Sequence, residues 1–270
     1  MERSDPRYQA YVGILKEELI PAMGCTEPIA LAYAAAKARE VLGVLPESVQ
    51  LQVSGSIIKN VKSVIVPNTG HLKGMEAAAA AGIIAGSAEK ELEVIAEVST
   101  DKQAAIRDYL QTVPISIEHI EQGHVFDIIV TERCGQDYAR VRIADFHTNI
   151  CLIEKDGKVL YEKPLADEAA QESSRVDRSL LNMKDIWEFA ETADLRDVAD
   201  LLERQIRYNN AIAEEGLLGD YGANIGRVLL STYGNDVSNR AKAKAAAGSD
   251  ARMNGCELPV VINSGSGNQG

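Results

Sequence analysis

Two stretches of small residues, 29–42 and 75–85, constrain the fold of this chain most strongly. They read IALAYAAAKAREVL and MEAAAAAGIIA, and both have the alanine content of strong helices. Pro28 stands where the first turn of a helix tolerates proline, and Gly43 follows where a helix ends. Because alanine and glycine let helix backbones approach closely, we expect the second helix to be buried.

The segments around these helices alternate between helical and strand patterns. Residues 7–20 predict a first helix, and 49–53 (VQLQV) predict a strand that pairs with 62–67 (KSVIVP). Residues 68–74 are expected to form a loop. From 183 to about 247 the pattern is helical again, and the chain then ends in a loop, a short apolar segment and a Gly/Ser/Asn-rich loop.

The pattern changes between residues 93 and 165. EVIAEVS (93–99) predicts a strand, 101–112 a polar helix, and alternating segments follow, the last two joined by an Asp-Gly turn. We therefore expect an α+β protein with a mostly helical core lobe, which holds a small β-sheet, and an inserted α+β lobe. The expected boundaries are 1–92 and 183–270 for the helical core, 93–165 for the insert and 166–182 for a polar linker.

Charge and cysteine content exclude several classes of function. The formal net charge of -12 argues against a general affinity for nucleic acid or for an anionic membrane. The N-terminus has no apolar signal core, and the longest stretch of low charge, from Met75, is too short to span a bilayer. Four cysteines without paired spacing fit a reducing compartment better than a disulfide framework. The sequence predicts a soluble, acidic, cytoplasmic protein.

Cys25 is the first residue that could carry chemistry. It lies between Gly24 and Thr-Glu-Pro at the start of the first alanine-rich helix. Unpaired backbone N–H groups and the helix dipole favour an anion there, which includes a thiolate. The setting suits a nucleophile and a metal ligand equally well, and a small buried turn residue is the third interpretation. The carboxylate of Glu27 could be stabilised by the same positive end of the helix, or it could act as a base.

The glycine-rich loop SGSGNQG at 264–270 is the second signal. Successive small residues free the backbone to form a nest of N–H donors that holds a carboxylate or phosphate, although no Gly-Lys-Ser/Thr follows as in a P-loop. A flexible linker is the alternative. Since the chain stops in this loop at Gly270, we expect a C-terminus truncated in mid-domain. Neutral polar side chains suited to a small polar substrate stand in the loop at Asn263, Ser264, Ser266, Asn268 and Gln269.

His71 is the histidine whose setting best suits a general acid or base. It stands in the polar loop VPNTGHLKG, directly before the second alanine-rich helix. VSGS at 53–56 adds another Gly/Ser turn. The remaining histidines are assigned structural or solvated roles: His119, His124 and His147. The remaining cysteines are interpreted as ordinary thiols: Cys134, Cys151 and Cys256, of which Cys256 alone lies near a candidate site in the sequence.

Taken together, these motifs resemble a known family. GCTEP near the N-terminus, SGS at 54–56, NTGH, and DARMNG followed by SGSGNQG are similar to the L-cysteine desulfidase group. That group belongs to the iron–sulfur L-serine dehydratase superfamily, which is serine dehydratase alpha-chain-like and includes the YhaM-type proteins. The similarity runs from about residue 8 to the last residue, and it is weaker through 93–182. Family members continue well past Gly270, so the resemblance also implies a chain that is short at its C-terminus.

The resemblance implies a lyase with a [4Fe–4S] cluster, held by three cysteine thiolates, as its Lewis acid. The β-substituent of a small amino acid leaves while a base removes the α-proton. L-Cysteine would give pyruvate, ammonia and sulfide, and L-serine would give pyruvate and ammonia; the sequence does not choose between them. Cys25 matches the N-terminal cluster ligand, and the other two ligands fall beyond Gly270. Related proteins have no cysteine at the position of Cys256, so Cys256 is not counted as a ligand. With one of three expected ligands present, this chain alone is expected to be inactive.

His71 matches the Gly-His of the family's substrate loop and is, with Glu27, an expected catalytic residue. The expected partner is a small amino acid; homo-oligomer formation is left open. The alternative is a non-catalytic module that binds a small amino acid or organic acid in the same pocket. A pyridoxal phosphate lyase would give the same products, but no lysine setting suits an internal aldimine. The expected substrate-binding residues are Thr26, Ser54, Ser56, Asn68, Thr69, Asn263, Ser264, Gly265, Ser266, Asn268 and Gln269.

Overall fold

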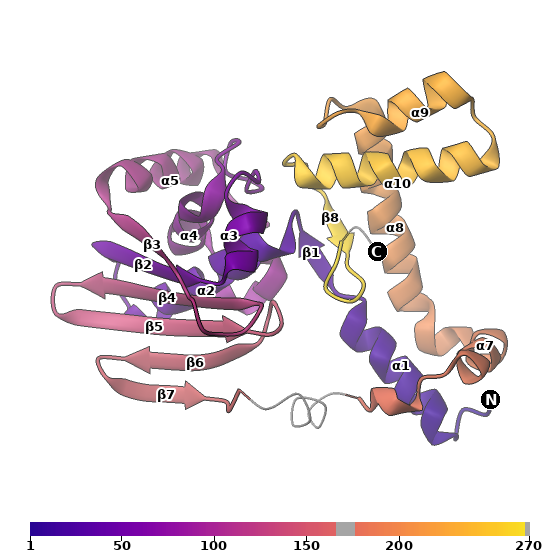
Figure 1. Cartoon of the computed structure of the whole chain (residues 1–270), viewed down its shortest axis with the longest axis horizontal. Coiled ribbons are helices and arrows are strands. Elements are labelled where there is room, and N and C mark those ends of the chain that lie inside the picture. Colours follow the sequence, from indigo (N-terminus) through magenta and orange to yellow (C-terminus); the bar gives the residue numbers. More distant parts are fainter. Residues whose placement is uncertain (166–175, 268–270) are drawn as a thin grey trace.

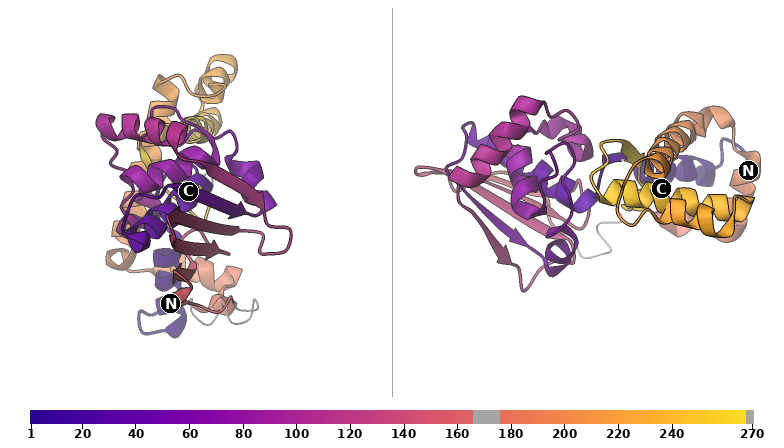
Figure 2. Two further views of the ribbon diagram at one scale, coloured as in Figure 1. Left: turned by 90° about the vertical axis from the view of Figure 1, so that its left-hand side faces the viewer. Right: turned by 90° about the horizontal axis from the view of Figure 1, so that it is seen from above.

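The computed structural model describes residues 1–165 and 176–267, which form two lobes joined by a short two-stranded sheet (Figure 1). The sheet lobe contains α2 to α5 and β2 to β7, and the helical lobe contains α1 and α7 to α10. The view from above, on the right of Figure 2, again shows the lobes side by side with the joining strands between them. The fold is α+β, as the sequence predicts.

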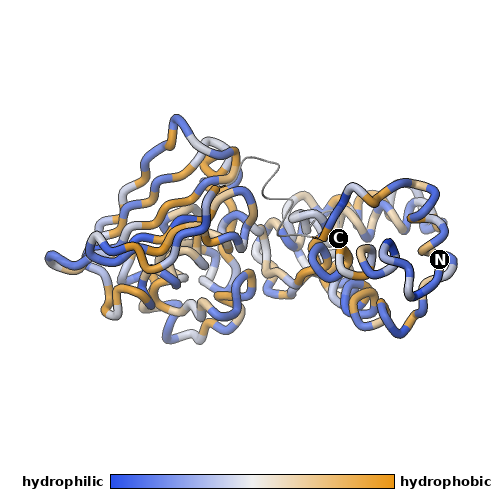
Figure 3. The backbone as a smooth tube through the Cα atoms, turned by 90° about the horizontal axis from the view of Figure 1, so that it is seen from below, coloured by the Kyte–Doolittle hydropathy of each residue, from blue (hydrophilic) through white to orange (hydrophobic). Residues whose placement is uncertain are grey.

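Six strands form the larger sheet in the order β3-β2-β4-β5-β6-β7. β3 runs parallel to β2, and every other neighbouring pair is antiparallel. Hydrophobic and hydrophilic residues alternate along these strands, because one face packs on helices and the other meets solvent (Figure 3). The bounds are β2 (Ser48–Val53), β3 (Ile115–His119), β4 (Asp127–Cys134), β5 (Asp137–Ala144), β6 (Ile150–Lys155) and β7 (Lys158–Glu162).

Helices α2 (Thr26–Leu42) and α4 (Gly74–Ala85) form the centre of the sheet lobe. A Cβ atom at Gly82 would overlap the backbone carbonyl of Ala32, so the two helices touch through their backbones. This contact confirms the prediction that the helix at 75–85 is buried. α2 also covers β4 and β5, while α3 (Gly55–Val61) and α5 (Thr100–Thr112) complete the lobe.

The helical lobe has a small aromatic core and a close pair of long helices. Tyr8 and Tyr11 of α1 meet Phe189 of α7 edge to face, with ring centroids 5.1 and 5.4 Å apart. A Cβ atom at Gly216 of α8 would overlap the carbonyl of Ala247 in α10, so these helices also approach backbone to backbone. The bounds are α1 (Pro6–Glu18), α7 (Met183–Thr192), α8 (Leu195–Leu218), α9 (Ile225–Tyr233) and α10 (Val237–Met253). α10 thus continues past the predicted end near residue 247.

The joint between the lobes is the antiparallel pair β1 (Pro21–Met23) and β8 (Pro259–Val261). Pro21 pairs with Val261 and Met23 with Pro259, so the strands that precede α2 and follow α10 lie side by side. Asn209 of α8 caps the free edge of β8, since its side chain accepts from Val261 N and donates to Val261 O. The joint thus brings together two segments that lie more than 230 positions apart, residues 21–23 and 259–261.

Two predicted strands are wrong. Residues 62–67 follow α3 and fold back on themselves: Ile65 bridges Lys73, and Val66 N donates to Leu72 O. Residues 93–99 follow the 3-10 helix η1 (Ala88–Glu93) and make tight turns, in which Ser87 N donates to Val94 O. Val66, Val94 and Ile95 are buried, yet the backbones of both segments find local partners instead of a sheet edge.

The predicted boundary at 92/93 runs through one sheet. β2, from the segment assigned to the helical core, lies between β3 and β4 of the segment assigned to the insert. The sheet lobe thus holds residues from both sides of that boundary. The division into two domains stays a prediction. Of the predicted linker 166–182, residues 166–175 lie outside the described residues, while Arg178 forms ion pairs with Glu17 and Glu18 of α1.

None of the helices within residues 1–165 and 176–267 has the length and apolar character needed to cross a bilayer.

Candidate active site

The N-terminus of α2 lies at the joint between the lobes. Gly24 links β1 to this helix with a φ of 58°, and a Cβ atom there would overlap the ring of Pro67. Glycine is therefore required twice, for the left-handed backbone and for the close approach. Cys25 follows as the N-cap residue of α2, with 4% of its surface exposed. The sequence motif GCTEP thus folds into a tight, buried turn at a helix start.

Glu27 is the polar centre of this turn. Its carboxylate accepts hydrogen bonds from Cys25 Sγ at 2.9 Å and Thr26 Oγ1 at 3.3 Å on Oε2, and from Asn60 Nδ2 at 3.2 Å on Oε1. Burial raises the pKa of Glu27, but the hydrogen bond from Cys25, the bond to its own backbone N–H and the attraction of His147 outweigh burial. The pKa of Glu27 is therefore lowered, and the carboxylate is ionised at neutral pH.

The same contacts act on Cys25 in the opposite direction. Burial, then the negative charge of Glu27 and the hydrogen bond to it, raise the pKa of the Cys25 thiol to about 12, although Arg252 opposes this rise. A thiolate at Cys25 therefore stays a prediction. In the arrangement described, burial and the neighbouring carboxylate of Glu27 favour the protonated thiol over the thiolate.

The turn at 263–267 closes over the start of α2. Asn263 and Ser266 exchange backbone hydrogen bonds of 3.0 and 2.9 Å, with Ser264 at a φ of 49° and Gly265 at 72° between them. Two left-handed residues between a bonded pair make a tight two-residue turn. Thr26 Oγ1 donates to Gly265 O at 3.4 Å, which joins the two sequence motifs in one site. Asn268 and Gln269 lie outside the described residues.

Arg252, from the motif DARMNG, lies beneath this turn. The side chain belongs to the last turn of α10 and is 5% exposed. Its Nε donates to Gly24 O at 2.9 Å, and Gly267 packs so closely on the guanidinium that a Cβ atom there would overlap it. Burial lowers the pKa of Arg252, and the charges of Cys25 and Glu27 act against that shift. The sequence interpretation assigned no role to this arginine.

His147 reaches the site from the sheet lobe, in the loop between β5 and β6. Its ring packs edge to face on Phe126 at 4.5 Å, and its Cε1 and Nδ1 lie 3.5 and 3.6 Å from the place of a Cβ atom at Gly265. Burial lowers the pKa of His147, while Glu27 opposes and Arg252 adds to that shift. The sequence interpretation missed this residue, because a histidine in a polar hairpin loop has the pattern of a solvated side chain.

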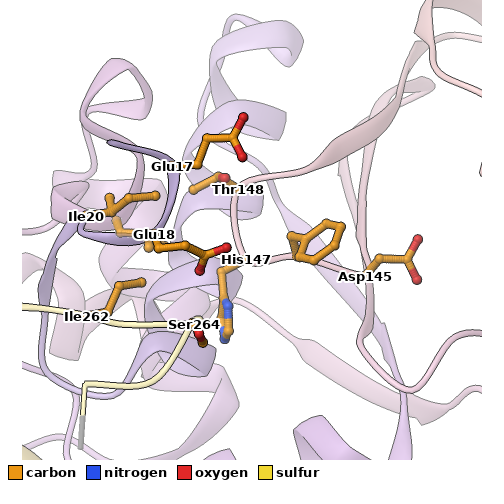
Figure 4. Close-up of a pocket in the computed structure, with 11 residues that line it drawn as sticks. Glu17, Glu18, Ile20, Asp145, His147, Thr148, Ile262 and Ser264 are labelled. Atoms are coloured by element: carbon orange, nitrogen blue, oxygen red, sulfur yellow. The ribbon is translucent and has the colours of Figure 1, made fainter. Parts of the chain in front are cut away.

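A cavity of about 330 Å³ opens beside His147 at the joint (Figure 4). Figure 4 shows the imidazole extending from its loop toward Ser264, with Glu18 and Ile20 on the side of the helical lobe. The lining is part acidic and part apolar. It comprises Glu17, Glu18, Ile20, Leu92, Asp145, Phe146, His147, Thr148, Ile262, Ser264 and Gly265. Its size suits a small organic molecule.

The predicted substrate loop around His71 is arranged differently. Thr69 Oγ1 donates to Val66 O at 2.7 Å within the loop, and Asn68 Nδ2 donates to Ile95 O at 2.8 Å, which ties the loop to residues 93–99. His71 is exposed, with a φ of 68°. The loop meets the site through Pro67, which packs on Gly24. The catalytic role of His71 stays a prediction.

The two predicted serines of VSGS lie at the start of α3. Ser54 is the N-cap residue, and its Oγ donates to Val125 O at 2.7 Å. Ser56 stands half-buried on the first helical turn. These contacts account for the Gly/Ser turn by local structure, and the proposed contact of Ser54 and Ser56 with a substrate stays a prediction.

The fit of the described residues to a [4Fe–4S] cluster is incomplete. Such a cluster takes three thiolates, but no group of three or more His, Cys, Asp or Glu side chains suited to a metal ion is present in residues 1–165 and 176–267. Cys151 Sγ donates to Arg142 O within the sheet, and Cys256 belongs to the apolar core. Cys25 is therefore left as a single candidate ligand, and the described residues by themselves do not fit a cluster.

Comparison with known proteins identifies the class. Residues 89–270 match the family model described as serine dehydratase alpha chain, and the chain belongs to that family. Several relatives carry the name UPF0597 protein. One from Desulfitobacterium hafniense is 59% identical over 270 residues, which cover 100% of this chain and 62% of that protein.

Two further relatives of that name also match almost the whole chain. The protein from Lachnoclostridium phytofermentans is 50% identical over 263 residues, which cover 97% of this chain and 62% of the relative. The protein from Treponema denticola is 42% identical over 275 residues, which cover 100% of this chain and 64% of the relative. The chain thus spans a little less than two thirds of the length of these relatives.

Proposed function

We propose that this chain forms part of a lyase that removes the β-substituent of a small amino acid. The products would be pyruvate and ammonia from L-serine, with sulfide in addition from L-cysteine. Membership of the serine dehydratase alpha chain family supports a related lyase role. The observation that carries the proposal is the hydrogen bond between Thr26 Oγ1 and Gly265 O, which unites GCTEP and the glycine-rich turn in one site.

The charges at this site suit an amino-acid zwitterion. The positive charge of Arg252 lies under the 263–267 turn, and the backbone N–H groups of such a turn favour a carboxylate. Glu27 and the acidic lining of the neighbouring cavity favour an ammonium group. We assign substrate binding to Thr26 and to residues 263–266, while the predicted roles of Asn268 and Gln269 lie outside the described residues.

A [4Fe–4S] cluster with Cys25 as one ligand is the finer part of the proposal. When bound, it would supply a Lewis acid for the leaving hydroxyl or thiol. Its remaining ligands would come from outside the described residues, and Cys25 would have to lose its proton to Glu27 or to solvent on binding iron. Iron–sulfur chemistry also suits the reducing, cytoplasmic setting predicted from the unpaired cysteines.

The test is anaerobic reconstitution of the intact protein with iron and sulfide, followed by assays of pyruvate and sulfide release. We expect a broad visible absorption band that is lost in air and turnover of L-serine or L-cysteine. Cys25→Ala should abolish both together, whereas Cys134→Ala, at the end of β4, should abolish neither. Binding of either amino acid without pyruvate release would contradict the lyase and favour the non-catalytic binding module. Turnover that persists in iron-free protein would contradict the cluster and leave the lyase.

A further inference from the structure

We propose that His147 is a catalytic residue of this site, the base that removes the α-proton of the amino-acid substrate. The proposal rests on the proposed function and names a residue for a step that any elimination requires. It replaces neither Glu27 nor Arg252, whose contacts hold the site together. Three observations carry it: an unpaired ring nitrogen, a fixed ring, and the occupied state of the competing base.

The first observation is that His147 Nε2 is buried and has no hydrogen-bond partner within the described residues. Buried polar atoms are normally paired, because an unpaired one costs about 1–3 kcal/mol in desolvation. The structure retains that cost at the wall of the 330 Å³ cavity, beside the glycine-rich turn. His147 lines this cavity, so its uncommitted ring nitrogen is a candidate to take a proton from a bound molecule.

The second observation is that the loop fixes the imidazole. Phe126 packs edge to face against the ring. Gly265 lies close to the ring as well, at 3.5 Å from Cε1 to the place of a Cβ atom. Two residues earlier, Asp145 bonds His124 Nδ1 at 2.6 Å through its side chain and Phe126 O through its backbone N–H. The ring is thus held in one position before a substrate arrives, as proton transfer in an active site requires.

The third observation concerns the other two candidate bases. Glu27 already accepts hydrogen bonds from Cys25, Thr26 and Asn60, so both of its carboxylate oxygens are engaged within the turn. His71 is exposed, on a loop whose side chains Asn68 and Thr69 are engaged with backbone carbonyls. His147 combines an unpaired nitrogen with a place in the cavity lining, beside the turn at 263–267.

The step balances as follows. Neutral His147 accepts the proton from Cα, and the electron pair of that C–H bond becomes the Cα=Cβ double bond. The Cβ–S or Cβ–O bond breaks, and its electron pair goes with the leaving group, hydrosulfide or hydroxide. The leaving group then takes the proton from the imidazolium ring. The remaining 2-aminoacrylate isomerises to an imine, and water hydrolyses it to pyruvate and ammonia. The histidine returns to its neutral form.

The kinetic test compares His147→Asn with wild type in the intact, reconstituted protein. General-base removal predicts a loss of roughly 10²–10⁴-fold in kcat with KM unchanged. The matched control is His119→Asn, an exposed histidine at the end of β3, which should keep full activity. A His147→Asn variant with wild-type kcat would overturn the role of His147 and leave the lyase proposal standing. A wild-type protein that turns over neither L-serine nor L-cysteine would overturn the lyase itself.

A second test needs no turnover. L-Alanine has no leaving group, and its addition to the 270-residue chain should shift the imidazole resonances of His147 in a heteronuclear NMR spectrum while those of His119 stay fixed. Shifts confined to backbone signals of 263–267, with His147 unchanged, would overturn contact between His147 and the substrate. The absence of any shift at millimolar L-alanine would count against an amino-acid site at this joint, and so against both proposals.

Discussion

Arg252 Nε donates a hydrogen bond to Gly24 O at 2.9 Å, across 228 positions of the sequence. The bond joins the last turn of α10 to the residue before Cys25, so the helical lobe directly supports the backbone that presents the thiol. A charged donor also satisfies a buried carbonyl that would otherwise lie unpaired. The contact makes Arg252 a structural element of the site as well as its positive charge.

Arg252→Met should lower the free energy of unfolding by about 1–3 kcal/mol, because Gly24 O loses its donor in a buried place. The measurement is urea unfolding followed by circular dichroism at neutral pH. Arg240→Met, an exposed position on the same helix, serves as the control and should leave the midpoint unchanged. Equal stability of the Arg252 variant and wild type would contradict a supporting role for the bond.

Gly82→Ala should destabilise the sheet lobe by about 1–3 kcal/mol or more, the usual cost of overpacking. The added methyl group would overlap the carbonyl of Ala32, and neither backbone has a side chain that could yield. Gly248→Ala in α10 is the control: its Cβ would stand 3.5 Å from Ala213, an ordinary contact, so helix propensity alone predicts a gain of up to about 1 kcal/mol. Thermal unfolding of the two variants separates the cases.

Cys25 should react slowly with iodoacetamide in the folded chain. With a pKa of about 12, only about one thiol in 10⁴ is ionised at pH 8, and the rate should rise with pH up to that value. Glu27→Gln removes the negative charge that raises the pKa, so alkylation at pH 8 should become faster. Glu97→Gln, an exposed carboxylate, is the control. Mass spectrometry of the Cys25 peptide over time gives the rates, and a slower reaction in Glu27→Gln would contradict the assigned electrostatics.

Glu132 should make the stability of the chain fall as pH rises. Both of its carboxylate oxygens are buried without a partner among the described residues, and burial raises its pKa well above the ordinary 4.5. The folded state therefore holds a proton that the unfolded state releases above about pH 4.5, so the favourable contribution is complete below that pH. It is lost as pH rises toward the folded-state pKa, at about 1.4 kcal/mol for each pH unit between the two pKa values.

Glu132→Gln should remove this dependence, because the amide does not titrate. Urea unfolding at pH 5 and pH 8 should show a smaller loss of stability in the variant than in wild type over that interval. Glu121→Gln, on an exposed loop, should keep the wild-type difference. Identical losses in the Glu132 variant and in wild type would mean that the carboxylate is already charged in the folded chain.

The parts of the fold that the sequence predicts well are those whose pattern reflects a local cause. Helices α2 and α4 follow from alanine content with Pro28 and Gly43 as end signals, and β4 to β7 follow from strict alternation with an Asp-Gly turn. The false strand at 62–67 contains the β-branched run Val-Ile-Val, but whether a strand forms depends on a free sheet edge, and β3 occupies the edge beside β2. Edge occupancy is a property of the tertiary fold.

The sequence predicted the two chain segments that form the site, but it did not predict His147 or Arg252 as part of it. Cys25, Thr26 and Gly265 stand in motifs whose small residues indicate a tight backbone, and the structure brings Thr26 and Gly265 together. His147 stands in an ordinary polar loop, and its importance comes from Phe126 and from the turn it meets, residues that lie far from it in sequence or carry no polar signal. Arg252 stands in the motif DARMNG, but its burial depends on a contact between the lobes that no local pattern encodes.

The hydrogen bond from Thr26 to Gly265 also has a consequence for synthesis. Its partners are 239 positions apart, so at about 5–20 residues per second the ribosome needs about 12–48 seconds between the first and the second. During that interval nothing from the glycine-rich turn or from α10 can cover Cys25, and the thiol that is buried in the finished protein is open to oxidants and to free metal ions. A nascent chain paused before residue 252 would therefore expose a thiol that the folded protein protects.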